Sequence, residues 1–244
     1  MDEAQNPLQT IHTVSNPPSG LIELRDLCKS YQSPAGPVPA LKHINLSIRD
    51  GEFVAVMGKS GAGKSTLVNR IAGIDCPDSG EISINGVQIN HLDEDERARW
   101  RGLNMGIVFQ FFQLLPSISL TKNVSIPMEF CNRFTAPERK QRALGLLDQV
   151  GILDHADKKP SLISGGQQQR VAVARALAND PPIVVADEPT GNLDSKTAAE
   201  ILDIFSGLAR QGKTILIVTH DKTVAARADR IVSLADGELI QPCI

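Results

Sequence analysis

The sequence lacks several features that define common protein classes. Aromatic residues make up only 4% of the 244 residues, and the four cysteines show no paired or metal-like spacing: Cys28, Cys76, Cys131 and Cys243. Reduced thiols in a cytosolic setting are therefore the simplest interpretation. The longest apolar runs, such as residues 53–57, are far shorter than the roughly 20 residues that cross a bilayer. We therefore expect no disulfide framework and no membrane span.

The chain also lacks an excess of basic residues. Its net charge is -3 and its pI is about 6.0, so nucleic acid is not expected as its main partner. Residues 1–20 contain no Lys or Arg and no continuous apolar stretch, which excludes a secretory signal. With their prolines they predict a flexible leader, followed by one folded domain over residues 21–244.

Apolar patterns in the rest of the chain predict an α/β fold. Residues 21–48 alternate in places around a turn at 33–37, which indicates an antiparallel sheet. Continuously apolar runs are typical of parallel strands covered on both faces, and they occur at residues 53–57, 105–109, 183–186 and 215–218. Helical patterns lie at residues 64–72, 137–150, 167–179 and 196–211. Residues 111–163 are expected to form a helical subdomain.

A phosphate-binding motif follows the first apolar run. It comprises Gly58, Lys59, Ser60, Gly61, Ala62, Gly63, Lys64 and Ser65, with Thr66 next, and it matches G-x-x-x-x-G-K-[ST] between a strand and a helix. The glycines let backbone N–H groups face the phosphates, and the following helix adds its positive end. We expect Lys64 to bind the phosphates of ATP and Ser65 to hold Mg²⁺.

Polar residues end the other three apolar runs. Asp187 and Glu188 follow the third run; Asp187 is expected to bind Mg²⁺ and Glu188 to orient or deprotonate the attacking water. Gln110 follows the second run and is a further Mg²⁺ ligand candidate, while His220 follows the fourth and could contact the γ-phosphate. An acidic pair or a lone histidine at a strand end is also common in ordinary loops. Convergence at one sheet edge favours the functional interpretation.

One segment is unexplained by a general nucleotide-binding fold: Ile163, Ser164, Gly165, Gly166 and Gln167. It resembles the signature of the ATP-binding cassette (ABC) ATPases. The resemblance covers nearly all of the chain from about residue 21. It implies a P-loop NTPase core with a mainly parallel sheet, an antiparallel β subdomain and a helical subdomain. It also implies that Tyr31 stacks on adenine, that residues 191–194 form the D-loop, and that Gln110 and His220 are the Q-loop and switch residues.

The same resemblance implies a partner copy of the chain. ABC ATPases form head-to-tail dimers around two ATP molecules, each bound by one copy's phosphate loop and the other copy's signature. Ser164, Gly165 and Gly166 at a helix start would form an anion-binding end, and the phosphate loop already provides one such end in cis. An ordinary Gly-Gly turn is the alternative. The departures, Ile163 for leucine and Lys59 for proline, leave the phosphate-contacting residues intact.

Finer motifs are similar to the lipoprotein-release and macrolide-export type, with the cell-division ATPase as a near relative. They are residues 108–116, 123–124 and 186–194. The resemblance implies a separate membrane permease and a peripheral location at the cytoplasmic face of the membrane. An apolar groove for a permease helix is expected near four residues, which could equally fill the helical lobe: Phe111, Phe112, Leu114 and Leu115.

Two other functions remain as alternatives. A soluble ABC ATPase acting on nucleic acid or ribosomes would be expected to carry two cassettes or a long coiled coil, which 244 residues do not accommodate. A regulatory module that binds ATP without hydrolysis would not need Glu188 and His220. The cargo, the direction of transport and the permease cannot be read from this sequence.

Overall fold

The computed structural model describes residues 20–240. The expected leader therefore lies outside the described residues, apart from Gly20, and Cys243 also lies outside them. The N-terminal half contains β1 (Ile22–Ser33), β2 (Gly36–Ile48), β3 (Phe53–Met57), α1 (Lys64–Ile71), β4 (Ser79–Ile84), β5 (Val87–Gln88), η1 (Ile89–His91), α2 (Glu94–Asn104) and β6 (Met105–Val108). The rest contains α3 (Leu120–Phe130), α4 (Ala136–Gln149), η2 (Leu153–His155), η3 (Pro160–Leu162), α5 (Gly165–Ala176), β7 (Ile183–Asp187), α6 (Ser195–Arg210), β8 (Thr214–Thr219), α7 (Lys222–Ala225), β9 (Arg230–Ala235) and β10 (Glu238–Ile240).

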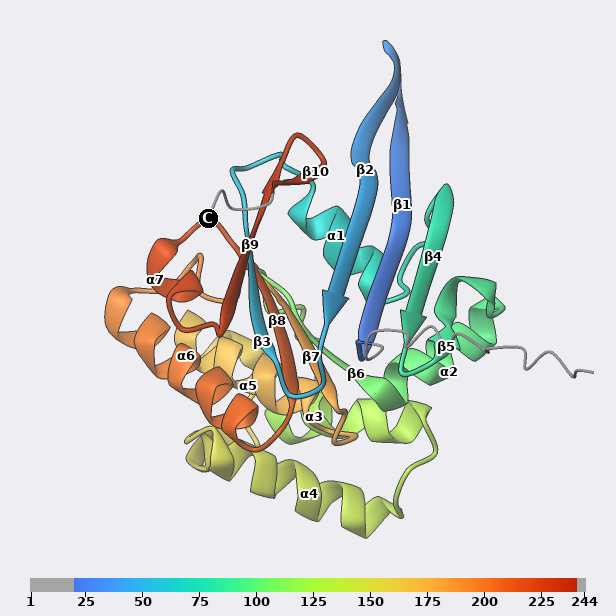
Figure 1. Cartoon of the computed structure of the whole chain (residues 1–244). Helices are drawn as coiled ribbons and strands as arrows, with labels where there is room; N and C mark the ends of the chain where they lie inside the picture. Colours follow the sequence, from blue (N-terminus) through green and yellow to red (C-terminus); the bar gives the residue numbers. More distant parts are fainter. Residues whose placement is uncertain (1–19, 241–244) are drawn as a thin grey trace, which may run out of the picture.

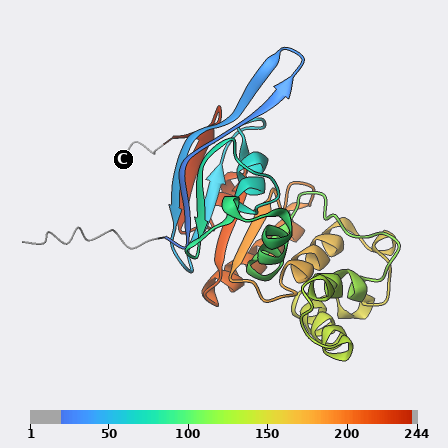
Figure 2. The ribbon, with the colours of Figure 1, turned by 90° about the vertical axis from the view of Figure 1, so that its right-hand side faces the viewer.

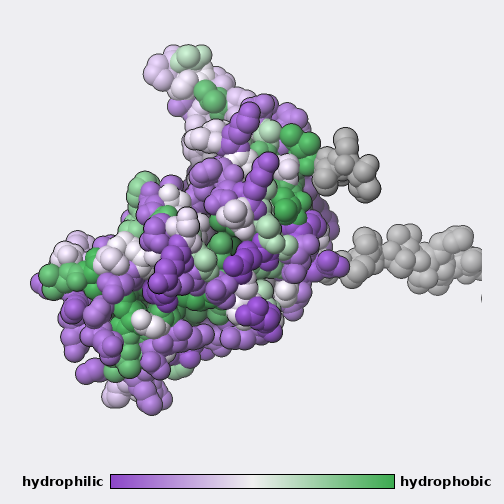
Figure 3. Space-filling view, turned by 90° about the vertical axis from the view of Figure 1, so that its left-hand side faces the viewer, coloured by the Kyte–Doolittle hydropathy of each residue, from purple (hydrophilic) through white to green (hydrophobic). Residues whose placement is uncertain are grey.

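Two sheets form the framework (Figure 1). One has six strands in the order β10-β9-β3-β8-β7-β6, and all its pairings are parallel except that of β10 with β9. The other is antiparallel, with the order β2-β1-β4-β5. The tip of the long β1–β2 hairpin stands clear of the rest of the molecule (Figure 1 and Figure 3). The predicted α/β architecture, with both parallel and antiparallel sheets, is confirmed.

The parallel strands are buried on both faces. In β8, Ile215 and Ile217 belong to one hydrophobic cluster, whereas Leu216 and Val218 belong to the other. Successive side chains of a strand point to opposite faces, so each cluster fills one side of the sheet. Figure 2 shows helices α3–α5 on one side and the antiparallel sheet on the other. Double coverage explains why these strands are continuously apolar in sequence.

Several elements were missed by the sequence analysis. Strand β9 is only partly buried along most of its length, so it has no continuous apolar run, and β4, β5 and β10 are short. Helix α2 is capped by Asp93, whose side chain accepts from Glu96 N while the Glu96 carboxylate accepts from Asp93 N. This capping box was the available signal for the helix. The strand predicted over 105–109 ends at Val108.

Helices α3, α4 and α5 pack against one another. The first two lie within the predicted helical subdomain, residues 111–163, and α5 follows that range. Helix α5 begins at Gly165, two residues before the predicted start, because Ser164 caps it. The boundary of a helical subdomain stays a prediction.

Candidate nucleotide-binding site

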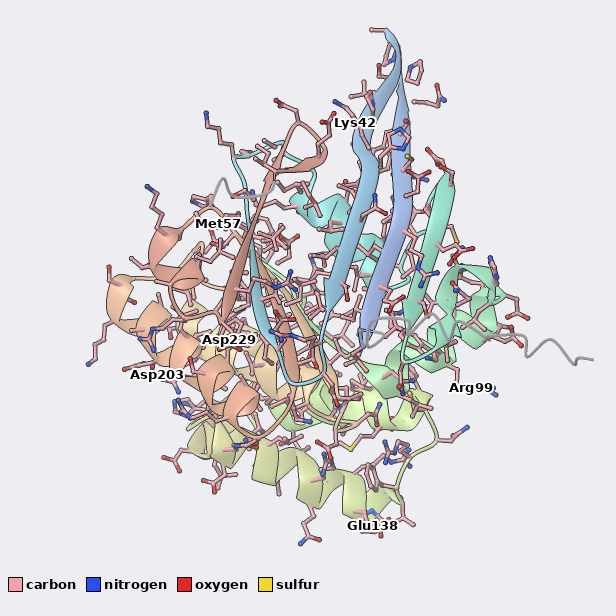
Figure 4. The ribbon with its side chains drawn as sticks, in the orientation of Figure 1. Lys42, Met57, Arg99, Glu138, Asp203 and Asp229 are labelled. Atoms are coloured by element: carbon pink, nitrogen blue, oxygen red, sulfur yellow. The ribbon has the colours of Figure 1, made fainter. Side chains whose placement is uncertain are left out.

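The phosphate loop connects β3, which ends at Met57 (labelled in Figure 4), to α1. Lys64 Nζ donates to the carbonyl oxygens of Gly58 at 2.8 Å and Lys59 at 3.0 Å. The phosphate loop therefore wraps around the lysine side chain. Gly63 has a φ of 102°, and a Cβ there would overlap the Ala40 carbonyl oxygen. Only glycine adopts this conformation at so close an approach without strain.

The Glu188 carboxylate is the centre of the polar contacts. Its Oε1 lies 3.3 Å from Lys64 Nζ, its Oε2 lies 2.9 Å from His220 Nδ1, and Thr219 Oγ1 donates to Oε2 at 3.4 Å. Glu188 has a φ of 45°, an uncommon conformation for a residue with a side chain and one often found at functional sites. The turn after β7 therefore holds this carboxylate beside the lysine and the histidine.

Asp187, at the end of β7, is partly buried. Its Oδ1 has no hydrogen-bond partner among the described residues. Burial raises the pKa of the Asp187 carboxyl; the Ser65 hydroxyl opposes that rise, the Glu188 charge adds to it, and the Lys64 charge opposes it. A buried carboxylate oxygen without a partner, beside a serine hydroxyl, fits a cation that also coordinates phosphate and water.

A cavity of about 400 Å³ unites most of the predicted site. Its lining comprises Tyr31, Ala40, Ser60, Gly61, Gly63, Lys64, Ser65, Thr66, Gln110, Glu188 and His220. Ala40 is the one lining residue that sequence reasoning missed. Gly58, Lys59 and Ala62 line an adjoining cavity of about 520 Å³ that also includes Ser60, Gly61 and His220. The endings of β3, β6, β7 and β8 thus meet at one edge of the parallel sheet, as predicted.

The signature segment is separate from this cavity. Ser164, Gly165, Gly166 and Gln167 are absent from its lining. Ser164 caps α5, because its hydroxyl accepts from Gln167 N at 3.3 Å while Gln167 Oε1 accepts from Ser164 N at 3.0 Å. Ser164 and Gly165 are exposed, and a Cβ at Gly166 would overlap the Thr197 side chain on α6. One copy of the chain therefore presents its signature outward.

The loop after Gln110 is held from two sides. Asn192 Nδ2 donates to the Gln110 carbonyl oxygen at 3.2 Å. Phe112 and Gln113 both have positive φ, and their carbonyl oxygens accept from the two Nη atoms of Arg175 near the end of α5. Burial lowers the pKa of Arg175. No motif in the sequence pointed to Arg175.

A groove of about 710 Å³ lies between α2, β6, α3 and α5. Its lining includes Phe109, Gln113, Phe130, Cys131 and Arg175. The four residues expected to form an apolar groove, Phe111, Phe112, Leu114 and Leu115, do not line it. Leu114 packs against the core, whereas Phe111 and Leu115 are exposed. A groove therefore exists near the predicted place, but other residues form it.

Within residues 20–240, no helix combines the length and apolar character that crossing a bilayer requires. The same residues hold no cluster of three or more His, Cys, Asp or Glu side chains arranged to bind a metal ion.

Comparisons with known proteins identify a family. The family model described as "ABC transporter" matches residues 41–191. The ABC transporter ATP-binding protein YvrO of Bacillus subtilis is 47% identical over 220 residues, which cover 90% of this chain and 96% of the relative. The macrolide export ATP-binding/permease protein MacB of Hyphomonas neptunium is 45% identical over 220 residues. This chain spans only 34% of the length of that relative.

Solved structures show the same fold. A dimeric structure of MJ0796, a bacterial ABC transporter cassette by its description, has a TM-score of 0.86 at 45% identity and covers 90% of this chain and 97% of that one. A dimeric post-hydrolysis state of MJ0796 bound to ADP and Pi has a TM-score of 0.85 at 44% identity. MJ0796 of Methanocaldococcus jannaschii is 46% identical over 223 residues. The predicted family, fold class and ATPase activity are confirmed: this chain belongs to the ABC transporter family and is an ATP-binding, ATP-hydrolysing cassette.

Proposed function

We propose that the chain works as a head-to-tail homodimer that closes around two ATP molecules and drives a separate membrane permease. The observation that carries this proposal is the meeting of Lys64, Gln110, Glu188 and His220 in one cavity, while Ser164 lies exposed outside it. Each cavity then needs a second copy to supply the missing anion-binding helix end.

ATP occupies the cavity in a defined direction. Tyr31 lies at the hairpin side of the lining and stacks on adenine, while the phosphate loop from Gly58 to Thr66 surrounds the phosphates with backbone N–H groups. Lys64 adds charge-assisted hydrogen bonds, each worth about 1.5–3 kcal/mol. Lys64 Nζ also donates to the carbonyl oxygens of Gly58 and Lys59, and these bonds hold the ammonium within the phosphate loop.

Three residues would hold Mg²⁺: Ser65, Gln110 and Asp187. The unpartnered Asp187 Oδ1 supports this assignment. The ion, when bound, would neutralise phosphate charge and fix the orientation of the phosphates. Glu188 accepts a proton from, or orients, the attacking water, and His220 holds the Glu188 carboxylate through the 2.9 Å contact of its Nδ1.

The second copy completes each site. Ser164, Gly165, Gly166 and Gln167 would contact the partner's ATP from the start of α5. The dimeric MJ0796 structures support this arrangement, since they share the fold at 44–45% identity. Gly166 suits the role because its lack of a side chain lets α5 approach Thr197 of α6 closely.

The groove of about 710 Å³ is the proposed permease contact. Phe130, with 83% of its surface exposed, lies at this groove, and exposed aromatic side chains are typical anchors for a partner helix. The names of MacB and PvdT join an ATP-binding and a permease part in one protein. Such a partner would hold this chain at the cytoplasmic face of the membrane as a peripheral subunit.

Isolation from host membranes tests the permease contact. The tagged chain is compared with Phe130→Arg, which places a charge at the groove, and with the control Ile240→Arg, which places one on an exposed residue of β10. We expect the chain and the control to retain one integral membrane protein, identified by mass spectrometry, and Phe130→Arg to lose it while keeping ATP binding. Equal recovery by all three would contradict the proposed contact.

A further inference from the structure

We infer that Arg70 is a positioning residue that fixes the Tyr31 ring and ties it to the phosphate-binding helix. The inference rests on the proposed function in one respect, namely that Tyr31 stacks on the nucleotide base. It assigns a role to a side chain that forms no part of any motif in the sequence. Arg70 lies on α1, the helix that begins at Lys64.

The surroundings of Arg70 are unusual for an arginine. The residue is 0% exposed, yet its Nε and Nη1 have no hydrogen-bond partner among the described residues. Its Nη2 makes both of its polar contacts: it donates to Tyr31 Oη at 2.8 Å and lies 2.7 Å from Asp75 Oδ2. A buried, incompletely paired guanidinium is a poor source of stability. The contact with Tyr31 supplies a functional reason for its presence.

Tyr31 lies in a part of β1 that pairs with one neighbouring strand. The pairing of β1 with β4 ends at Cys28 and Ser79, so at Tyr31 the strand pairs only with Val38 of β2. Tyr31 is 43% exposed. The hydrogen bond from Arg70 holds the hydroxyl end of the ring at α1, and Tyr31 lines the cavity.

The segment after α1 strengthens this connection. Asp75 pairs with Arg70, and Asp78 Oδ1 lies 3.0 Å from Lys29 Nζ. Asp78 Oδ2 also accepts from Ser30 N at 2.6 Å. Two carboxylates thus join the strand of Tyr31 to the helix of the phosphate loop. Lys29 Nζ and the Arg70 guanidinium carbon lie 5.7 Å and 5.8 Å from the ring centroid, within the range of cation–π attraction.

The arrangement sets the spacing between base and phosphates. Lys64 and Arg70 are six residues apart on one helix, which is a rise of about 9 Å. Because one helix carries both contacts, the distance between the Tyr31 ring and the phosphate loop is fixed, and the base and the phosphates of ATP bind at that separation. Loss of the hydrogen bond should therefore weaken binding of nucleotides but not of a ligand that has no base.

The experiment compares ATP with inorganic tripolyphosphate, which has phosphates but no base. Arg70→Met keeps the length of the side chain and removes its donors, and Tyr31→Phe keeps the ring and removes the acceptor. We expect each variant to lower ATP affinity on the order of three- to tenfold and the double variant to add little more. Tripolyphosphate affinity should stay within about twofold of the unchanged chain. Arg25→Met, on the same strand in an exposed ion pair, is the control.

Tyr31 is the sole tyrosine of the chain, so labelling with 3-fluorotyrosine gives one ¹⁹F signal. Arg70→Met should shift or broaden that signal without nucleotide, whereas Arg25→Met should leave it unchanged. If Arg70→Met does not fold, Arg70→Lys and Tyr31→Phe provide the affinity test.

The outcomes separate two failures. If Tyr31→Ala leaves ATP affinity unchanged, the proposed stacking is wrong. If Tyr31→Ala weakens ATP binding while Tyr31→Phe and the Arg70 variants do not, the stacking holds and the role of Arg70 is wrong. An equal loss of ATP and tripolyphosphate binding would also overturn the inference, because it would make Arg70 a general support of α1.

Discussion

The Lys64 ammonium lies 3.3 Å from the Glu188 carboxylate, so the phosphate-loop lysine and the proposed catalytic carboxylate are in direct contact. Their side chains are only 7% and 12% exposed. In these surroundings each charge stabilises the other. A change at one residue will therefore act on the other, and binding must be measured apart from turnover.

Glu188→Gln should leave ATP binding intact and lower turnover by about 10²-fold or more, since the amide cannot accept the proton of the attacking water. Phosphate release measures turnover, and a fluorescent ATP analogue measures binding. The stalled enzyme should accumulate as an ATP-bound dimer in light scattering. Asp203→Asn, in an exposed pair with Arg227, is the matched control. Normal turnover in Glu188→Gln would remove Glu188 from its role.

Ser164→Arg should abolish hydrolysis and spare ATP binding to the single chain, because Ser164 lies outside the chain's own cavity. A mixing experiment sharpens this prediction. Lys64→Ala should also be inactive, but a mixed dimer of the two variants contains one site with an intact phosphate loop and an intact signature. ATPase activity should therefore return on mixing. Failure to recover any activity would point to a different dimer or to none.

Gly63→Ala should destabilise the fold and weaken ATP binding more than Gly61→Ala. Both glycines have positive φ, 102° and 81°, so an alanine at either position is strained. At Gly63 the new Cβ would also overlap the Ala40 carbonyl oxygen, whereas at Gly61 it would meet no atom within 4 Å. We expect a cost above about 1 kcal/mol for Gly63→Ala. Urea unfolding measures the loss of stability in each variant, and equal losses for Gly63→Ala and Gly61→Ala would contradict the prediction.

Asp78→Asn should lower stability at neutral pH and lose this effect in acid. The hydrogen bond from Lys29, and then that from Ser30 N, lower the pKa of Asp78 below its ordinary value of 3.8. The charged form is therefore favoured by folding, so its contribution is complete above the ordinary value and is lost as pH falls through the lowered one. Because the side chain is 47% exposed, the contribution is about 0–1 kcal/mol. Unfolding curves at several pH values measure it; a difference that persists in strong acid would contradict this assignment.

The sequence predicted the parts of the fold that have one-dimensional patterns. The parallel strands β3, β6, β7 and β8 are apolar throughout because both of their faces are covered. Strand β9 escaped prediction because much of it is only partly buried. The antiparallel sheet was predicted from β1 and β2, but the short strands β4 and β5 were not.

The candidate site divides in the same way. The phosphate loop and the acidic pair at residues 187–188 could be predicted because neighbouring residues form each motif. Tyr31 was assigned to the site through the resemblance to a family, because a single aromatic residue in a hairpin does not by itself indicate a binding site. The bond from Arg70 to Tyr31 spans 39 positions in sequence, and that from Arg175 to Gln113 spans 62. Contacts at such separations depend on the packed fold and leave no local pattern.

The two bonds from Arg175 to the backbone of Phe112 and Gln113 have a mechanical consequence. Helix α5 begins at the signature segment, and near its other end Arg175 binds the loop that follows Gln110. In the proposed dimer, a displacement of α5 by contact of the neighbouring copy with Ser164 would be transmitted through the Arg175 bonds to that loop. Gln113 and Arg175 also line the groove proposed for the permease. A displacement of the loop would therefore change the shape of that groove.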